Sequence, residues 1–488
     1  MFAKIQRIHF VGIGGIGMSG IAEVLLNLGY KVSGSDLKSS SVTQRLAGLG
    51  AVTFEGHRAE NIAGAEVVVT SSAIAAENPE LAEARRLHIP VIQRAEMLAE
   101  LMRLKYGIAI AGMHGKTTTT SMVAAVLAAG GLDPTVVVGG RIGAMGSNAR
   151  LGNSQYLVAE ADESDRSFLK LSPILAVITN VDREHMDCYR NMGDVRRAFL
   201  DFAGRVPFYG TVIACNDDSL LRGIIPRIPR RVVTYGVRRG SNFRIKILDG
   251  ETGVSPVLPG GDARLSMDED YPISRFAITY KEQSLGEFRL HVPGLHNVLN
   301  ATAAIAVGVG LDINIERIRA GIENFRGVDR RFQLRGKAGG ISVVDDYGHH
   351  PTEIRATLAA ARQCKFGKIH VVFQPHRYTR TKLLMEEFAT AFKDCDSLFL
   401  LDIYAASEVP MEGVTSEILA GKIAASSGHT TRYCSTFQDA GGSVAALAQP
   451  GDMILTLGAG NVGQLVPLIL EQLRAKKDPA SAANADRD

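Results

Sequence analysis

Residues 112–120 read GMHGKTTTT and follow an apolar run that is typical of a β-strand. In such a loop the backbone N–H groups bind phosphate oxygens, a lysine reaches the β- and γ-phosphates, and the next hydroxyl ligates Mg2+. Lys116 and Thr117 have the residue types and the spacing that this chemistry needs. The regular P-loop pattern has a glycine where this chain has Ile110. A strand, Gly-Lys-Thr and a helical pattern in succession nevertheless predict a phosphate-binding loop.

Carboxylates gather at the end of a later strand of the same segment, in the stretch VAEADESD. Glu160 ends the apolar run, where a carboxylate can reach a metal ion, and Asp162, Glu163 and Asp165 follow it. A solvated acidic loop is the alternative, but a phosphate-binding loop in the same segment favours a magnesium site. His185, in the stretch NVDREHMD after another strand, is either a metal ligand or an ordinary loop histidine.

A second glycine-rich loop lies near the N-terminus. Gly12, Gly14 and Gly17 follow the first strand and open a helix, and Asp36 ends the next strand. Glycines at this spacing permit a tight turn and a close backbone approach, and the helix N-terminus favours a pyrophosphate. The pattern predicts a bound nucleotide without identifying it; NAD is one candidate, and a simple glycine turn is the alternative.

Three segments position these loops, and each alternates short β-branched runs with helical patterns, as parallel sheets covered by helices do. We predict an α/β protein of three tandem domains: a Rossmann-like domain (1–104), a central P-loop domain (105–327) and a second Rossmann-like domain (328–475). Residues 243–292 alternate in short runs broken by Gly, Pro and Asp, which predicts antiparallel hairpins added to the central domain. Residues 476–488 are polar and small, which predicts a disordered tail.

Composition agrees with this architecture. The chain has 488 residues, which suggests three domains at about 150 residues each. A net charge of +3 is too small to indicate nucleic acid or an anionic membrane as a partner. The five cysteines are scattered without a CxxC pair, so neither disulfides nor a structural zinc site is predicted. Apolar runs stay well short of about 20 residues, and we therefore expect a cytoplasmic protein without membrane insertion.

Eight stretches, taken in order, resemble the Mur ligase family over about residues 5–470: GIGGIGMSGIA, GMHGKTTTT, EADESD, NVDREHMD, GLHNVLNA, GVDRRF, DDYGHHPTE and FQPHRYTR. The resemblance is greatest to the members that join L-alanine to the lactyl carboxylate of UDP-N-acetylmuramate through an acyl phosphate, in peptidoglycan precursor synthesis. It implies that the first domain binds the UDP-sugar, the second ATP and Mg2+, and the third the amino acid. It also implies small-molecule partners only, and a monomer or weak homodimer.

The resemblance implies roles for individual residues. The residues implied to bind the UDP-sugar are Gly14, Gly15, Ile16, Gly17, Asp36, Ser71 and Ser72. The residues implied to bind ATP are Gly112, His114, Gly115, Lys116, Thr117, Thr118, Asn297, Asn300 and Arg331. The implied metal ligands are Thr117, Glu160 and His185, and the implied catalytic residues are Lys116, His185, Arg331 and Asp346. The implied amino-acid end comprises Tyr347, His349, His376, Arg377 and Arg380, and either His349 or His350 could accept the proton of the amine.

One departure from the pattern of related ligases and three alternative functions remain to be considered. Several related ligases carry a carbamoylated lysine after the NVDREHMD stretch, but residues 185–207 contain no lysine, so the way a second metal ion is held stays open. A ligase that joins UDP-N-acetylmuramate to a tripeptide would share the P-loop and the histidine pair. An NAD-dependent dehydrogenase would explain the first glycine loop but not the P-loop. A P-loop switch without chemistry would leave VAEADESD and FQPHRYTR unexplained.

Overall fold

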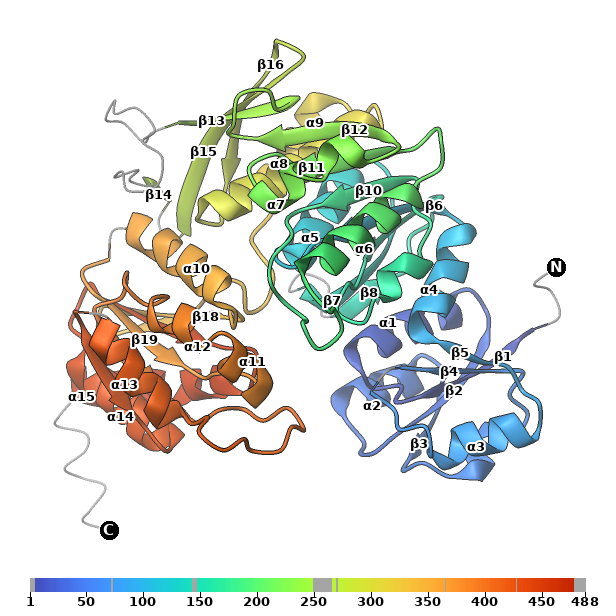
Figure 1. Ribbon diagram of the computed structural model, residues 1–488, viewed down its shortest axis with the longest axis horizontal. Coiled ribbons are helices and arrows are strands. Elements are labelled where there is room, and N and C mark those ends of the chain that lie inside the picture. Colours follow the sequence, from blue (N-terminus) through green and yellow to red (C-terminus); the bar gives the residue numbers. More distant parts are fainter. Residues whose placement is uncertain are drawn as a thin grey trace. The chain divides into compact units, whose positions relative to one another are not determined.

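Three β-sheets, each with its own helices, follow one another along the chain of the computed structural model (Figure 1). The structure describes residues 5–71, 73–142, 147–248, 266–268, 271–364, 366–426 and 428–477. The chain divides into two compact units: the first comprises residues 1–246, 276–288 and 299–328, and the second comprises residues 247–275, 289–298 and 329–488. The first unit contains the N-terminal sheet and most of the central one, and the second unit contains the C-terminal sheet.

The N-terminal sheet has the strand order β3-β2-β1-β4-β5, and all of its strand pairs are parallel. Its strands are β1 (Arg7–Val11), β2 (Lys31–Asp36), β3 (Val52–Glu55), β4 (Val67–Thr70) and β5 (Val91–Gln93). Its helices are α1 (Ile16–Asn27), α2 (Ser41–Gly48), η2 (Ala59–Ile62), α3 (Pro79–Arg86) and α4 (Arg94–Arg103). Since β1 runs straight into the glycine loop and α1, the predicted pyrophosphate loop lies at the carboxyl edge of this sheet.

A buried carboxylate, Glu80, joins β2 to the start of α3. Its Oε2 accepts a hydrogen bond from Ser35 Oγ and its Oε1 accepts one from Asn61 Nδ2, each at 2.6 Å. Burial alone would raise the pKa of Glu80, but the neighbouring His9 and these hydrogen bonds lower it to about 2. The ionised carboxylate therefore fixes the end of β2, where Asp36 directly follows Ser35.

The central sheet has eleven strands in the order β14-β15-β13-β12-β11-β10-β6-β9-β7-β8, with β16 also paired to β15. Its first strands are β6 (Tyr106–Ala111), β7 (Thr135–Ile142), β8 (Ser147–Arg150), β9 (Tyr156–Glu160), β10 (Leu175–Ile178) and β11 (Thr211–Cys215). The remaining strands are β12 (Arg231–Gly236), β13 (Phe243–Leu248), β14 (Ser266–Asp268), β15 (Tyr271–Tyr280) and β16 (Gln283–Leu290). Its helices are α5 (Lys116–Ala129), η3 (Ser167–Lys170), α6 (Met192–Gly204), α7 (Ser219–Arg222), η4 (Ile225–Arg227), α8 (Leu295–Gly310) and α9 (Ile315–Glu323). Because β6 lies between β9 and β10, the loops that follow these three strands converge at one edge.

The added strands of the central domain include both antiparallel and parallel pairs. β14 pairs antiparallel with β15, as predicted, whereas β13 lies next to β15 and pairs in parallel with β12, which precedes the predicted hairpin region. Asn242, just before β13, is joined to β12: its Oδ1 accepts hydrogen bonds from Thr234 N at 2.8 Å and from Thr234 Oγ1 at 3.0 Å. Residues 249–265, within the same predicted hairpin region, lie outside the described residues.

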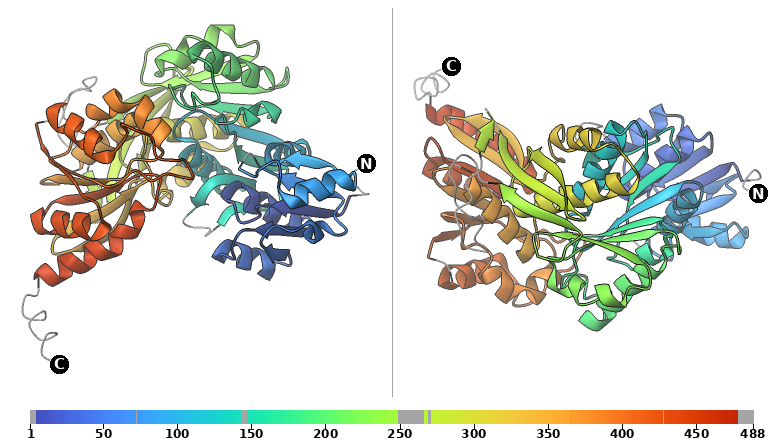
Figure 2. Two further views of the ribbon diagram at one scale, coloured as in Figure 1. Left: turned by 60° about the horizontal axis from the view of Figure 1, so that its bottom comes forward. Right: turned by 90° about the horizontal axis from the view of Figure 1, so that it is seen from above.

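The C-terminal sheet has the order β17-β18-β22-β19-β20-β21, with only the edge pair β17–β18 antiparallel. Its strands are β17 (Gln333–Ala338), β18 (Ile341–Asp346), β19 (Ile369–Phe373), β20 (Ser397–Leu400), β21 (Thr430–Tyr433) and β22 (Met453–Leu457). Its helices are α10 (Pro351–Gln363), α11 (Tyr378–Leu383), α12 (Met385–Ala389), α13 (Ser416–Ser426), α14 (Phe437–Leu447), η5 (Val462–Leu465) and α15 (Val466–Lys477). Helices α10, α12 and α13 pack in one apolar cluster and α14 and α15 in the other, so both faces of the sheet are covered (Figure 2). The predicted tail lies almost wholly outside the described residues.

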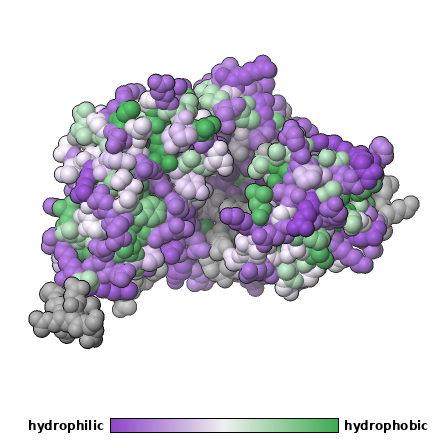
Figure 3. Space-filling view, turned by 90° about the horizontal axis from the view of Figure 1, so that it is seen from below, coloured by the Kyte–Doolittle hydropathy of each residue, from purple (hydrophilic) through white to green (hydrophobic). Residues whose placement is uncertain are grey.

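The surface carries mainly hydrophilic residues with smaller apolar areas between them on the face that Figure 3 shows. Within the described residues, no helix combines the length and the apolar character that crossing a membrane requires.

Candidate active site

The P-loop connects β6 to α5, and its glycines have conformations and neighbours that exclude larger side chains. Gly112 (φ +133°) and Gly115 (φ +83°) both have positive φ. A Cβ atom on Gly112 would lie 2.0 Å from Thr179 Oγ1, and one on Gly115 would lie 2.8 Å from Asn300 Oδ1. The loop is therefore enclosed by the residue after β10 and by α8, which places Asn300 beside it.

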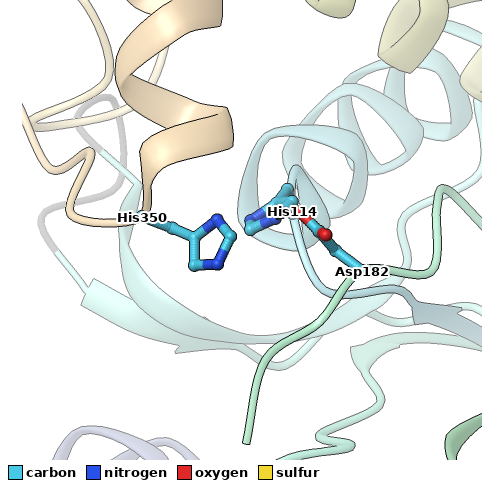
Figure 4. A group of neighbouring side chains, drawn as sticks. All are labelled: His114, Asp182 and His350. Carbon is cyan, nitrogen blue, oxygen red and sulfur yellow. Dashed lines mark hydrogen bonds and ion pairs between the residues drawn. The ribbon is translucent and has the colours of Figure 1, made fainter. Parts of the chain in front are cut away.

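The segment after β10 holds the backbone of the P-loop in place. Asn180 Oδ1 accepts a hydrogen bond from His114 N at 2.9 Å, and Thr179 Oγ1 donates one to His114 O at 2.7 Å. The His114 ring pairs through Nε2 with Asp182 Oδ2 at 2.9 Å (Figure 4). Figure 4 also labels His350, which caps α10 in the second unit. The predicted nucleotide residue His114 is thus oriented by a carboxylate of the NVDREHMD stretch.

Lys116 is the first residue of α5, and its ammonium group points back into the loop. Its Nζ donates to Gly112 O and to Glu163 Oε1, both at 2.7 Å, and to Met113 O at 3.3 Å. Burial alone would lower the pKa of Lys116, but the charges of Glu163 and Asp162 raise it. The lysine is therefore a fixed cation, and a phosphate oxygen could replace any of these acceptors.

The acidic stretch after β9 lies against this cation. Glu160 is the last residue of β9 and pairs in register with Ile110, two residues before Gly112. Glu163 is fully buried; burial raises its pKa to about 7 although Lys116 lies beside it. Glu163 Oε1 lies 3.6 Å from His185 Nε2, and His185 has a positive φ of +56°. The structure thus brings Glu163 and His185 to the lysine of the P-loop.

The other predicted nucleotide residues lie on α5 and α8. Thr117 and Thr118 are buried in the first turn of α5. Asn297, in the first turn of α8, donates from Nδ2 to Pro293 O at 2.7 Å, and it is not the N-cap residue. Its side chain therefore braces the turn that leads into α8.

The predicted UDP-sugar residues form the first glycine loop of the N-terminal sheet. Gly14 N donates to Asp36 Oδ2 at 2.9 Å, and a Cβ atom on Gly14 would lie 2.8 Å from the same oxygen. Gly15 caps α1 without a side-chain hydrogen bond, and Ile16 begins the helix. A helix N-terminus behind glycines suits a pyrophosphate. Ser71 directly follows β4, and Ser72 lies outside the described residues.

In the second unit, Asp346 accepts hydrogen bonds from the backbone next to Arg331 and Tyr347. Asp346 accepts from Phe332 N at 2.7 Å and from Gly348 N at 2.8 Å. Burial raises the pKa of Asp346, although the charge of Arg331 opposes the rise. The Arg331 guanidinium lies 5.1 Å from the centre of the Tyr347 ring and 3.8 Å from Glu353 Oε1. Asp346 therefore positions the loop that carries Arg331.

The predicted amino-acid residues form a row of rings with two arginines at its end. The His349 and His376 ring centres are 5.8 Å apart, and Tyr404 stacks on His376 at 5.6 Å. Arg380 Nη1 lies 3.1 Å from His376 Nδ1, and burial with these cationic neighbours lowers the pKa of His376 to about 3. Arg377 N donates to Tyr404 O at 2.8 Å, and its φ is +72°. His376 is therefore a neutral ring in a cationic neighbourhood.

Comparison with known proteins identifies the family of this chain. Three family models match in order: "Mur ligase family, catalytic domain" at residues 7–106, "Mur ligase middle domain" at residues 110–308 and "Mur ligase, glutamate ligase domain" at residues 330–460. A UDP-N-acetylmuramate–L-alanine ligase of Koribacter versatilis is 69% identical over 477 residues, which are 98% of this chain and 99% of the relative. The chain belongs to the Mur ligase family.

Further similarities agree with this assignment to the Mur ligases. A UDP-N-acetylmuramate–L-alanine ligase of Acidobacterium capsulatum is 61% identical over 98% of this chain and 99% of the relative. The crystal structure of the UDP-N-acetylmuramate–alanine ligase of Thermotoga maritima matches with a TM-score of 0.76 and 28% identity, over 96% of this chain and 99% of that one. The predicted family and the predicted three-domain α/β architecture are both confirmed.

Three residues of this Mur ligase lie in the candidate sites without having been singled out from the sequence. They are Glu163 beside Lys116, Tyr404 beside His376, and Arg94 beside Gly17. Glu163 was visible only as one of four acids in VAEADESD. Tyr404 ends the run SLFLLDIY, and the rule that sites form at the carboxyl ends of parallel strands could have found it. Nothing in the sequence near Arg94 indicates its contact with the glycine loop.

Proposed function

We propose that this Mur ligase joins the amine of L-alanine to the lactyl carboxylate of UDP-N-acetylmuramate, with conversion of ATP to ADP and phosphate, in the synthesis of peptidoglycan precursors. The observation that carries the proposal is 69% identity, over nearly the whole of both chains, to a relative named for this reaction. The P-loop, with Lys116 on α5, is the feature that the reaction needs and that a dehydrogenase would not. We place the enzyme in the cytoplasm, where both nucleotide substrates would be available, as a monomer or weak homodimer.

The chemistry follows from the poor reactivity of a carboxylate. A carboxylate oxygen attacks the γ-phosphorus, the bond to the β-phosphate oxygen breaks, and ADP leaves behind an acyl phosphate. The neutral amine of alanine then attacks the acyl carbon, the amide C–N bond forms, and inorganic phosphate departs while the amine loses a proton. Both substrates of the first step are anions, so fixed cations must reduce their repulsion. Lys116 supplies one such cation. We assign Arg331 and Asp346 to the reaction at the nucleotide, as the resemblance implies.

The donor set beside Lys116 fits a magnesium ion. Thr117 and Glu160 offer oxygen ligands of the kind that Mg2+ prefers, and His185 adds a nitrogen. Glu163 Oε2 is buried and accepts no hydrogen bond within the described residues, so the local charge favours a cation. We assign Thr117, Glu160 and His185 to the metal. Bound Mg2+ would neutralise charge on the transferred phosphate.

The division of substrates among the domains follows the predicted boundaries. We assign the UDP-sugar to residues 1–104, with the pyrophosphate at Gly14, Gly15, Ile16 and Gly17, and ATP to residues 105–327. We assign L-alanine to residues 328–475, at Tyr347, His349, His376, Arg377 and Arg380. These assignments keep each anionic group beside a helix N-terminus or a cation.

Hydrogen bonding of the ring nitrogens supports a choice between the two histidines that could accept the proton of the amine. His350 Nδ1 accepts a hydrogen bond from Thr352 N at 3.3 Å, so that nitrogen caps α10. His349 Nδ1 lies 3.2 Å from Tyr347 O, an acceptor that fixes the ring proton on Nδ1. In a neutral His349 the lone pair is then on Nε2, which is the nitrogen that a base requires. We therefore assign the role of proton acceptor for the amine to His349.

Phosphate release measured with ATP, UDP-N-acetylmuramate and a panel of amino acids tests the proposed function. We expect release only when all three substrates are present, with L-alanine as the preferred amino acid. Release that needs no amino acid, or that occurs only with a tripeptide, would contradict the proposal.

The metal assignment makes a separate prediction. Glu160→Ala and His185→Ala should each raise the Mg2+ concentration for half-maximal turnover by about tenfold, since each removes a ligand or its support. The double variant should need little more Mg2+ than either single one, because both residues serve one metal-centred unit. Magnesium titrations of initial rates give these values. Asp165→Asn, in the exposed part of the same acidic stretch, is the matched control; equal titration curves for all variants would show that Glu160 and His185 are only loop residues.

A further inference from the structure

The Arg94 side chain contacts both the first glycine loop and the acidic stretch of the central domain. A Cβ atom on Gly17 would lie 2.4 Å from Arg94 Nη1 and 3.1 Å from its Cζ, so the guanidinium occupies the space that Gly17 leaves open. Gly17 does not have a positive φ. Its lack of a side chain is therefore explained by room for Arg94 rather than by backbone conformation.

The other end of the same guanidinium reaches the acidic stretch of the P-loop domain. Arg94 Nη2 donates to Asp162 Oδ2 at 3.1 Å. The second oxygen, Asp162 Oδ1, accepts from Ser164 N and Ser164 Oγ, which fixes the carboxylate in its loop. Burial would raise the pKa of Asp162, but the charges of Lys116 and Arg94 lower it. Asp162 is thus an anion held in its loop and paired with Arg94.

Charged contacts thus lead from the first glycine loop to the P-loop: Arg94 pairs with Asp162, and Glu163, the next residue, pairs with Lys116. With the proposed substrates added, the UDP pyrophosphate lies at the Arg94 end and the ATP phosphates lie at the Lys116 end. An anion that binds beside Gly17 would hold the Arg94 guanidinium in place, and the guanidinium in turn holds Asp162 and the acidic stretch that Lys116 meets at Glu163. ATP would then bind beside a stretch that is already ordered, and the cost in conformational entropy of ordering it would not be incurred a second time.

On this basis, which rests on the proposed function, we propose that Arg94 and Asp162 couple the UDP-sugar site to the ATP site, so that each substrate strengthens the binding of the other. The coupling must be reciprocal, because it is a difference in binding free energy. Arg94 is a positioning residue in this proposal, since it acts on ATP only through Asp162.

A second ion pair from the same helix provides the matched control. Glu96, two residues further along α4, pairs with Lys170 of η3. This pair also links the N-terminal and central domains, but it does not contact the glycine loop or the P-loop among the contacts that the structure describes. Glu96→Gln removes its charge and keeps a side chain that can still accept from Gln93 N, as Glu96 does at the start of α4.

Calorimetric titration with AMP-PNP and Mg2+, with and without UDP-N-acetylmuramate, tests the proposal on the full chain. In the wild type the dissociation constant of AMP-PNP should fall by about tenfold when the UDP-sugar is present. Arg94→Ala and Asp162→Asn should each abolish this change, and Arg94→Lys should restore part of it. Gly17→Ala, which displaces the guanidinium without removing it, should also weaken the effect. Glu96→Gln should keep the full wild-type change.

Three results would contradict the coupling: no mutual effect in a wild type that binds both ligands, full coupling in Arg94→Ala, or equal losses in Arg94→Ala and Glu96→Gln. The last of these would show that the ion pair only holds the domains together. Failure of the wild type to bind UDP-N-acetylmuramate at all is a different outcome, because it would contradict the proposed function itself.

Discussion

Lys116→Ala is expected to reduce turnover by about 100- to 1,000-fold, which corresponds to roughly 3–4 kcal/mol of transition-state stabilisation. The reason is that Lys116 is a buried cation in the P-loop, held by Gly112 O and by Glu163 Oε1 at 2.7 Å from its Nζ. An alanine leaves three nearby carboxylates, those of Glu160, Asp162 and Glu163, without this charge. The anionic phosphates would then meet net negative charge where they now meet a cation.

Single-turnover and steady-state phosphate release measure the loss, and binding of UDP-N-acetylmuramate in the absence of ATP should change by no more than about twofold. Lys170→Ala removes a lysine of the same domain that pairs with Glu96 on α4, and this control should retain turnover. Circular dichroism checks that the variants fold. If Lys116→Ala kept most of the wild-type rate, the P-loop would have no place in the reaction.

The Lys116→Ala variant should also change the protonation of Glu163. Burial already raises the pKa of Glu163 to about 7 although Lys116 lies beside it. Without the lysine, Glu163 loses the neighbour that most favours its charged form, so it should take up a proton near neutral pH. A buried carboxylate that becomes neutral is less destabilising than one that stays charged and unpaired. This is a physical reason to expect the variant to remain folded while its chemistry fails.

Local signals in the sequence were sufficient to predict where the two glycine-rich loops lie in the fold. The strand β2 ends at Asp36, where the sequence placed its end, and the first glycine loop opens α1 as predicted. Glycine spacing and strand periodicity act over a few residues, so they can be read from the chain itself. The short strand β3 was not predicted, because VTFE is half exposed and lacks the apolar run that signals a buried strand.

Contacts between distant segments could not be predicted in this way. Arg94 meets Asp162 across 68 positions of sequence, and Lys116 meets Glu163 across 47. No periodicity in the sequence reveals that β13 pairs in parallel with β12. Each of these features is decided by tertiary packing, and local pattern carries no information about it. The residues that neutralise or orient the predicted ones were therefore the part of the site that the sequence left out.

Arg377 should decide how this enzyme holds its amino acid. The Arg377 side chain is exposed and has no hydrogen bond or ion pair within the described residues, whereas Arg380 is occupied by His376. A planar guanidinium is the best match for the carboxylate of a free amino acid, since it can form two parallel hydrogen bonds. We therefore expect Arg377, more than Arg380, to bind the alanine carboxylate.

Arg377→Ala should raise the Michaelis constant for L-alanine by about 10- to 100-fold, the loss expected for a charge-assisted pair. Arg377→Lys should recover part of the loss, because it keeps the charge but not the fork, and UDP-sugar binding should be little changed in both. Arg355→Lys, an exposed arginine on α10, is the matched control. Initial rates at varied alanine concentration provide the constants, and unchanged values in Arg377→Ala would place the carboxylate elsewhere.

Arg377 should also favour a single amino acid over a tripeptide as the substrate. An arginine that binds the carboxylate next to the reacting amine limits the site to a single amino acid. A tripeptide has an amide at that position instead of a carboxylate. The amide offers no charge to the guanidinium, and the chain beyond it must extend past Arg377 and the stacked His376 and Tyr404 rings. The wild type should therefore turn over with L-alanine and show little activity with L-alanyl-D-glutamyl-diaminopimelate. Faster turnover with the tripeptide would assign the chain to a different member of the Mur ligase family, while the ATP-dependent ligase chemistry would stand.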